Sequence, residues 1–222
     1  MSDEQQEQND YSDQYQPKQL ETFPQQPLYC LDTKLPTELC NIIHRYMSKL
    51  PTDEGETYGS NNEGLRDTIV QWSDTNDWVG PFIYNYVKQA NKHLFNYDID
   101  GVYFDDVHML TYNKDQWYGW HTDTNEMVSI AHAPPSHGSF LELPTTEYVR
   151  KLAFTLQLSD ENSYEGGDLL LALNDDLLDP ITIPKTKGQM VIFDTRVKHM
   201  VKPVTKGTRH TLVGWAVGPR WK

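Results

Sequence analysis

The stretch Tyr148-Val-Arg-Lys-Leu-Ala-Phe-Thr-Leu-Gln-Leu158 is rich in aliphatic and aromatic side chains and is long enough for a strand that crosses a whole sheet. Five similar runs lie around it, each bounded by turn residues: Val102–Tyr112, Trp117–Asp123, Asp168–Leu173, Gln189–Asp194 and Thr208–Val217. No helix is predicted between them. Such a series of short strands indicates a mainly β fold, either a sandwich or a jelly roll.

Two helices are predicted before these strands. Apolar residues recur at helical spacing from Leu39 to Leu50, after Pro36 in a first-turn position, and again from Val79 to Leu94. A polar loop over Pro51 to Gly64 separates them. We expect both helices to pack against the core and to carry no chemistry, so that residues 28–97 form a helical support and residues 98–222 the jelly-roll core.

Two segments differ in composition from the rest. Residues 1–27 hold eight Gln, six acidic residues and one Lys, and this polar composition predicts a disordered tail. Residues Ser129 to Glu147 interrupt the strands with Pro134, Pro135, Gly138 and two histidines. A loop of this length is a candidate lid that closes over substrate.

The overall composition narrows the function classes. The net charge of −13 argues against nucleic acid as a partner, because binders of the phosphate backbone carry a basic footprint. Cys30 and Cys40 are too few for a disulfide framework or a cysteine zinc site. The 222 residues contain no apolar run of membrane-spanning length and no signal peptide, so we expect a cytoplasmic protein that does not bind membranes.

One constellation points to metal chemistry. His121 and Asp123 stand two residues apart on a predicted strand, and side chains at this spacing share one face. His199 follows the strand that ends at Asp194, and Arg209 begins the last strand. Two imidazoles and one carboxylate leave three open positions on a metal, as in the non-heme Fe(II) oxygenases. The guanidinium is suited to binding the carboxylate of a keto-acid co-substrate.

Three ordered segments of the chain resemble the Fe(II)/2-oxoglutarate-dependent dioxygenases, specifically their prolyl 4-hydroxylase-like branch. The segment from Tyr112 to Asp123 resembles the pattern Y-x-x-G-x-x-Y-x-x-H-x-D, with Asp115 where that pattern has Gly. The segment from Arg150 to Leu169 includes a strand and a turn resembling Y-x-G-G-x-L. The third segment runs from His199 to Trp215, with Pro203, Gly207 and Arg209-x-Thr211.

This resemblance implies a mainly β fold with a double-stranded β-helix (jelly-roll, cupin-like) core and supporting helices, and it assigns roles to individual residues. It implies that His121, Asp123 and His199 bind iron, and that Arg209 binds the distal carboxylate of 2-oxoglutarate with help from Thr211 and Tyr112. Thr155 and Gln157 share a strand face that is expected to meet the co-substrate, while Trp215, Arg150 and Tyr118 are candidates for the substrate pocket. For each of these secondary residues, an ordinary packing role is the alternative interpretation. The remaining histidines are interpreted as structural, with His210 pointing away from the site.

The activity implied is hydroxylation with Fe(II), 2-oxoglutarate and dioxygen, decarboxylation of 2-oxoglutarate to succinate, and ascorbate as an additional reductant. The first hypothesis for the substrate is a prolyl residue in a protein or peptide. A free amino acid or other small molecule is the alternative, and a catalytically inactive cupin-like binding protein is a third possibility. Intact His121, Asp123, His199 and Arg209 argue against the inactive protein. The sequence makes no prediction of oligomeric state.

Overall fold

The computed structural model describes residues 28–54, 66–73, 77–102, 107–124, 129–130, 147–173, 177 and 179–221. The helices are α1 (Thr37–Met47), α2 (Val79–Ala90) and the π-helical turn η2 (Asn91–Phe95) that extends α2. The strands before residue 131 are β1 (Tyr29–Lys34), β2 (Thr52–Glu54), β3 (Arg66–Asp67), β4 (Ile69–Trp72), β5 (Gly101–Val102), β6 (His108–Tyr112), β7 (Trp117–His121) and β8 (Ser129–Ile130). The later strands are β9 (Glu147–Gln157), β10 (Tyr164–Gly166), β11 (Leu169–Ala172), β12 (Ile181–Thr182), β13 (Gln189–Asp194), β14 (Lys198–Val201), β15 (Val204–Gly207) and β16 (Arg209–Pro219).

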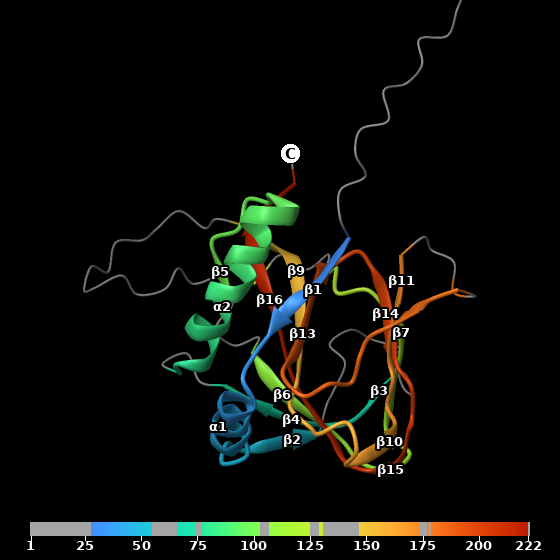
Figure 1. Ribbon diagram of the computed structural model, residues 1–222. Coiled ribbons are helices and arrows are strands. Elements are labelled where there is room, and N and C mark those ends of the chain that lie inside the picture. The colour runs from blue at the N-terminus through green and yellow to red at the C-terminus, as the bar shows by residue number, and fades with distance from the viewer. Residues whose placement is uncertain are drawn as a thin grey trace, which may run out of the picture.

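The strands form two main antiparallel sheets. Nine strands make the larger one, in the order β1-β13-β9-β16-β6-β4-β2, with β5 on β16 and β8 on β9. Five make the smaller one, in the order β12-β11-β14-β7-β3, and β10 pairs with β15. In Figure 1 the two helices lie on one side of the larger sheet and the smaller sheet faces its other side. This arrangement confirms the mainly β fold with a jelly-roll core and supporting helices.

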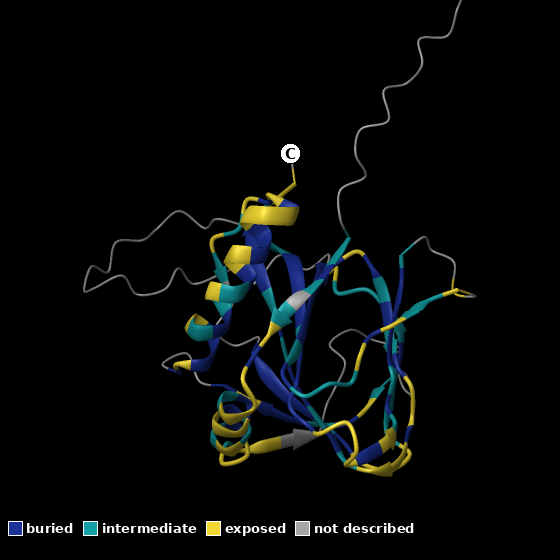
Figure 2. Ribbon diagram, in the orientation of Figure 1, coloured by how far each residue is buried: buried dark blue, intermediate teal, exposed yellow. Residues whose placement is uncertain are grey.

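Alternation along β9 and β16 explains why the larger sheet is covered on both faces. Leu152, Phe154 and Leu156 pack with the helices, in one core cluster with Ile43 and Ile83. Residues of opposite parity, such as Ala153, belong to a second cluster between the sheets. Figure 2 shows the same division, because the helices are buried where they face the sheet and exposed on their outer side. Of residues 151–158 on β9 and just after it, all are buried except Thr155, which is partly buried, as expected for a strand covered on both faces.

The strands expected from the sequence are confirmed, most closely Gln189–Asp194, which matches β13 residue for residue. The run Val102–Tyr112 contains two separate strands, β5 and β6, with residues 103–106 outside the described part. The two helices are also confirmed. Pro36, however, precedes the first turn of α1 as its N-cap residue, with φ −57° and ψ 144°.

The division into a helical support (28–97) and a core (98–222) does not match the strand pairing. Strand β1 pairs with β13, β4 pairs with β6, and β2 extends the sheet from within the expected polar loop at Pro51 to Gly64. Strands β1, β2 and β4 have three to six residues. Periodicity is weak over such lengths, and they are held by ladder hydrogen bonds to distant segments. The predicted tail at 1–27 lies outside the described residues.

Candidate metal and co-substrate site

The three expected metal ligands meet between the two sheets. His121 ends β7 and lies directly opposite His199 on β14 in the strand register. Asp123 follows β7, where its backbone N–H donates to the Thr195 carbonyl at 2.9 Å. One ligand atom from each residue falls within 4.8 Å of the other two. This grouping is small enough to surround a single metal ion.

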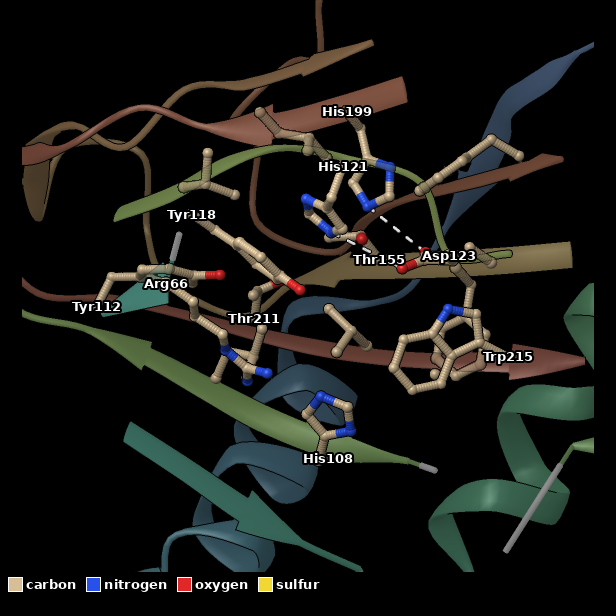
Figure 3. Close-up of a pocket in the computed structure, with 18 of the residues that line it drawn as sticks. Arg66, His108, Tyr112, Tyr118, His121, Asp123, Thr155, His199, Thr211 and Trp215 are labelled. Atoms are coloured by element: carbon tan, nitrogen blue, oxygen red, sulfur yellow. Dashed lines mark ion pairs between the residues drawn. The ribbon is translucent and has the colours of Figure 1, made fainter. Parts of the chain in front are cut away.

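Both imidazoles are oriented for metal binding by backbone carbonyls. His121 Nδ1 lies 2.8 Å from the Gly119 carbonyl oxygen, and His199 Nδ1 lies 3.1 Å from that of Val197. A carbonyl only accepts, so Nδ1 carries the proton and Nε2 presents its lone pair. The two Nε2 atoms face the Asp123 carboxylate at 3.7 Å and 3.4 Å, along the dashed lines of Figure 3. The donor set therefore fits a divalent metal such as Fe(II).

The protonation states agree with this interpretation. Burial and the neighbouring His199 lower the pKa of His121 to about 4, so its imidazole is neutral at pH 7. Burial alone would raise the pKa of Asp123, but His199, His121 and the indole of Trp215 hold it below its usual value. A neutral imidazole and an ionised carboxylate are the forms that bind metals.

Arg209, the expected carboxylate anchor, is at the start of β16 and is 2% exposed. Its Cζ lies 5.4 Å from the centroid of the Tyr112 ring, and its Nη1 is buried without a hydrogen bond to any residue that the structure describes. Burial of a cation costs free energy unless an anion or acceptor meets it. The orphaned Nη1 is what a pocket for a dicarboxylate co-substrate requires.

A pocket of about 520 Å³, including its open mouth, joins these groups, and Tyr112, Thr155 and Thr211 line it as expected. Thr211 Oγ1 donates to the Leu156 carbonyl at 3.0 Å, so its proton is already used. Burial raises the pKa of Tyr112, and that of Tyr118 to about 12, so both phenols stay protonated and can donate. Their hydroxyl groups reach into the same pocket in Figure 3.

Gln157 is placed differently from its prediction. It lines a smaller adjoining pocket that shares Thr155 and Arg209 with the main one. Its Nε2 donates to the Tyr164 hydroxyl at 3.0 Å and to the Ser159 carbonyl at 3.4 Å. Thr155 and Gln157 do share a strand face, but the sheet continues past the main pocket before it reaches Gln157.

The three candidate substrate residues surround the metal ligands unevenly. Tyr118 stacks on His121, with ring centroids 3.7 Å apart and planes at 13°. Trp215 lies beside Asp123 in Figure 3. Arg150 is outside the pocket lining, and its guanidinium covers the Trp215 ring at 3.6 Å. Arg150 therefore holds Trp215 in place at the pocket edge.

Two polar residues of the pocket were not predicted from the sequence. His108, interpreted as structural, lines the pocket between the rings of Trp72 and Trp215, with centroids at 4.4 Å and 5.4 Å. Its spacing from Leu110 and Tyr112 on one strand is the signal that identifies its face. Arg66 lines the pocket from the short strand β3 and has no such signal.

The other expectations have mixed outcomes. His210 does point away from the site, toward His44 on α1, with ring centroids 4.5 Å apart. Asp115 adopts φ 71°, the left-handed conformation that glycine takes freely, so the replacement of Gly preserves a positive-φ turn. The candidate lid at Ser129 to Glu147 lies almost entirely outside the described residues, as do its His132 and His137.

Residues 107–217 match the model of the 2OG-Fe(II) oxygenase superfamily. A PKHD-type hydroxylase of Synechococcus sp. (strain CC9605) is 37% identical over 90 residues, which is 40% of each chain. In fold, the chain is similar to a Pseudomonas putida prolyl-4-hydroxylase (TM-score 0.63, 17% identity, 86% of this chain and 92% of that one). It is also similar to a Trichoplax adhaerens prolyl hydroxylase in complex with a hypoxia inducible factor peptide fragment (TM-score 0.59, 16% identity, 85% and 82%).

The chain belongs to the 2OG-Fe(II) oxygenase superfamily, as the resemblance predicted, and its fold is similar to that of prolyl hydroxylases. It aligns with about 40% of the length of the curated relatives it matches first. In the described residues, the helices are too short or too polar to cross a membrane.

Proposed function

We propose that this protein is an Fe(II)- and 2-oxoglutarate-dependent dioxygenase that hydroxylates a prolyl residue in a peptide or protein. The observation that carries the proposal is the convergence of two Nε2 atoms and one carboxylate beside a buried guanidinium, whose Nη1 has no hydrogen-bond partner among the described residues. Family membership and the prolyl hydroxylase names of the structural neighbours support the choice of reaction and substrate.

Iron with 2-oxoglutarate supplies the oxidising chemistry: dioxygen is consumed, 2-oxoglutarate becomes succinate and CO₂, and one oxygen atom enters a substrate C–H bond. The chain's own residues bind and orient the reactants. His121, Asp123 and His199 hold the metal from one side. Arg209 anchors the distal carboxylate of 2-oxoglutarate, and the Tyr112 phenol is available to donate to it.

The walls of the pocket shield the reaction from water. Phe193 contacts His199 edge-to-face at 4.8 Å between ring centroids, and Tyr118 covers His121. Leu169 and Val213 complete the apolar lining. Exclusion of water strengthens the electrostatic interactions inside the pocket and limits side reactions. Trp215, beside Asp123, is our candidate for contacting the prolyl ring.

A free amino acid or other small molecule is the second candidate substrate. Pockets lined, like this one, by apolar and aromatic side chains with a few polar groups also bind small molecules, so a peptide is not required. An inactive binding protein is the third candidate, and the complete set of donors argues against it. Use of ascorbate stays a prediction.

The test is an oxygen-free titration with Fe(II) and 2-oxoglutarate, followed through the weak visible charge-transfer band, and then exposure to oxygen with succinate quantified. We expect the band, and succinate that increases when proline-containing peptides are added. A band with slow, unstimulated succinate directs the search to small molecules. If no band forms with reduced iron, the proposed metal site is refuted and the inactive binding protein becomes the favoured candidate.

A further inference from the structure

Arg66 is a pocket cation for which the proposed chemistry has no role. It lies on β3, outside the part of the chain that the family model matches. Its Nε and Nη2 are buried, and neither makes a hydrogen bond to a residue that the structure describes. Buried polar groups are almost always paired, so an orphaned guanidinium in a pocket is a candidate for binding a ligand.

Neighbouring contacts hold Arg66 in this position. It lies opposite Tyr118 in the β3–β7 register, and its Cζ is 5.2 Å from the centroid of that ring. The adjacent Asp67 accepts a hydrogen bond from Gln116 Nε2 at 2.7 Å, and Thr68 Oγ1 donates to the Thr111 carbonyl at 2.8 Å. The strand is therefore anchored on both sides. The cation–π contact offsets part of the cost of burying Arg66, but the ring face provides no hydrogen-bond acceptor in the plane of the guanidinium N–H groups.

Charge balance shows what Arg66 lacks. With the proposed cofactors bound, the two positive charges of iron offset the two carboxylates of 2-oxoglutarate. Asp123 offsets Arg209. Among the described charged residues that line the pocket, this leaves Arg66 without a counter-charge. Its charge also reaches the site, since it acts to lower the pKa values of Tyr112, Tyr118 and His121.

We propose that Arg66 binds a carboxylate of the substrate, so that the substrate of this enzyme is an acid. The inference rests on the proposed function and deepens it. A guanidinium binds a carboxylate through two parallel hydrogen bonds, for which Nε and Nη2 are a suitable pair. Tyr118 contacts both Arg66 and His121, so the carboxylate is held about one aromatic ring away from a metal ligand.

Two sources provide this chemistry: the α-carboxylate of a free amino acid, or the side chain of an acidic residue beside the target in a peptide. Calorimetry distinguishes them with the full chain loaded with Mn(II) and 2-oxoglutarate without oxygen, so that nothing turns over. The first probe pair is L-proline and L-prolinamide. The second is a capped Ala-Pro-Glu-Ala peptide and its Gln counterpart.

In at least one pair we expect the carboxylate probe to bind about ten-fold or more tightly than its amide counterpart, the effect of one charge-assisted pair. Arg66→Gln should abolish this difference, and Arg66→Lys should retain part of it. Lys114→Gln is the matched control, because it removes a positive charge from a side chain that is 69% exposed on the neighbouring turn. It should leave the preference unchanged.

Three results overturn the proposal. The first is equal binding of the carboxylate and amide probes by the wild-type protein. The second is that the wild-type protein binds neither carboxylate probe. The third is that Arg66→Gln binds 2-oxoglutarate more weakly but still binds the carboxylate probes, because Arg66 would then bind the co-substrate and not the substrate. Failure of the proposed function is separate. It would appear as lost Fe(II) and 2-oxoglutarate binding by the wild-type protein before any probe is added.

Discussion

His121 and His199 illustrate how single residues prepare this site. Each imidazole is fixed by the carbonyl two residues before it, so the sequence around each histidine sets its tautomer and leaves Nε2 for the metal. Asp123 completes the set because burial is outweighed by nearby positive and polar groups that stabilise its charge. In the described part of the chain, no other group of His, Cys, Asp and Glu side chains is placed to hold a metal ion.

Removing a ligand should therefore abolish metal binding. We expect His121→Ala and Asp123→Ala to weaken Fe(II) binding by more than about 100-fold, the upper range for loss of an outer-shell partner. Oxygen-free calorimetry measures this directly. Glu165→Gln is the control, because that side chain is 65% exposed on β10 and paired with Lys206. Retained iron affinity in either ligand variant would remove that residue from the metal site.

Arg209 can be tested independently of the metal. Arg209→Met keeps much of the side chain's volume but loses the guanidinium, and we expect 2-oxoglutarate affinity to fall about 10- to 100-fold, as for a lost charge-assisted hydrogen bond. Fe(II) affinity should be nearly unchanged. The two dissociation constants are measured in one titration series, and an unaltered value for 2-oxoglutarate would contradict the assigned role.

At the scale of elements, the turn after β10 positions the carboxylate anchor. Gly166 and Gly167 have φ values of 72° and 62°, which side-chain-bearing residues rarely adopt. A Cβ at Gly166 would collide with the backbone oxygen of Pro203. At Gly167 it would lie 3.1 Å from Arg209 Cδ. One glycine thus serves the fold, and its neighbour also leaves room for the anchor.

These neighbouring glycines should give different phenotypes. Gly166→Ala should lower the free energy of unfolding by at least about 1–2 kcal/mol, the usual cost of the left-handed conformation. Gly167→Ala should also displace Arg209 and weaken 2-oxoglutarate binding in the protein that remains folded. Gly101→Ala is the control, since nothing lies within 4 Å of its added Cβ. Thermal unfolding measures the loss of stability, and co-substrate titration measures the loss of 2-oxoglutarate affinity. If Gly167→Ala and the Gly101→Ala control bound 2-oxoglutarate equally well, the predicted displacement of Arg209 would be refuted.

At the scale of the whole molecule, the larger sheet supports chemistry on one face and stability on the other. Strand β16 shows this division within a few residues. Arg209 and Thr211 line the pocket, while Leu212 packs in the helix-side core and His210 contacts His44 on α1. The helical layer is therefore coupled to the strand that carries the anchor.

This interface should make stability sensitive to acid. Burial, together with His44, lowers the pKa of His210 to about 4, below the value of about 6.5 in an unfolded chain. Between these values the unfolded chain takes up a proton that the folded protein excludes. The free energy of unfolding should therefore fall as pH decreases from about 6.5 to 4. Above about pH 6.5, His210 is neutral in both states and adds no pH dependence.

Denaturant unfolding at several pH values checks this prediction. The fall should be smaller in His210→Phe, which cannot be protonated. His93→Phe is the control, because His93 is exposed on η2 and its replacement should preserve the wild-type slope. The same slope in His210→Phe as in the wild-type protein would exclude His210 as the source.

Sequence alone predicted most of the metal site because its signals are local or carried by ordered motifs. His121 and Asp123 share a strand face, and Arg209 and Thr211 share another. Strands β9, β13 and β16 are long enough to show their character. The short strands β2 and β3 were missed, since two or three residues cannot establish a period and their pairing partners are distant in the chain.

The amino-acid sequence was sufficient to predict the fold class and the family and to name the three candidate metal ligands. Which other residues share their pocket became known from the three-dimensional arrangement. Gln157 lines an adjoining cavity, while His108 and Arg66 line the pocket that contains the candidate metal ligands. The physical reason is register: local spacing sets the face on which a side chain lies. Its neighbours across the sheets depend on hydrogen-bonded pairing between remote segments, such as His121 with His199 and Arg66 with Tyr118.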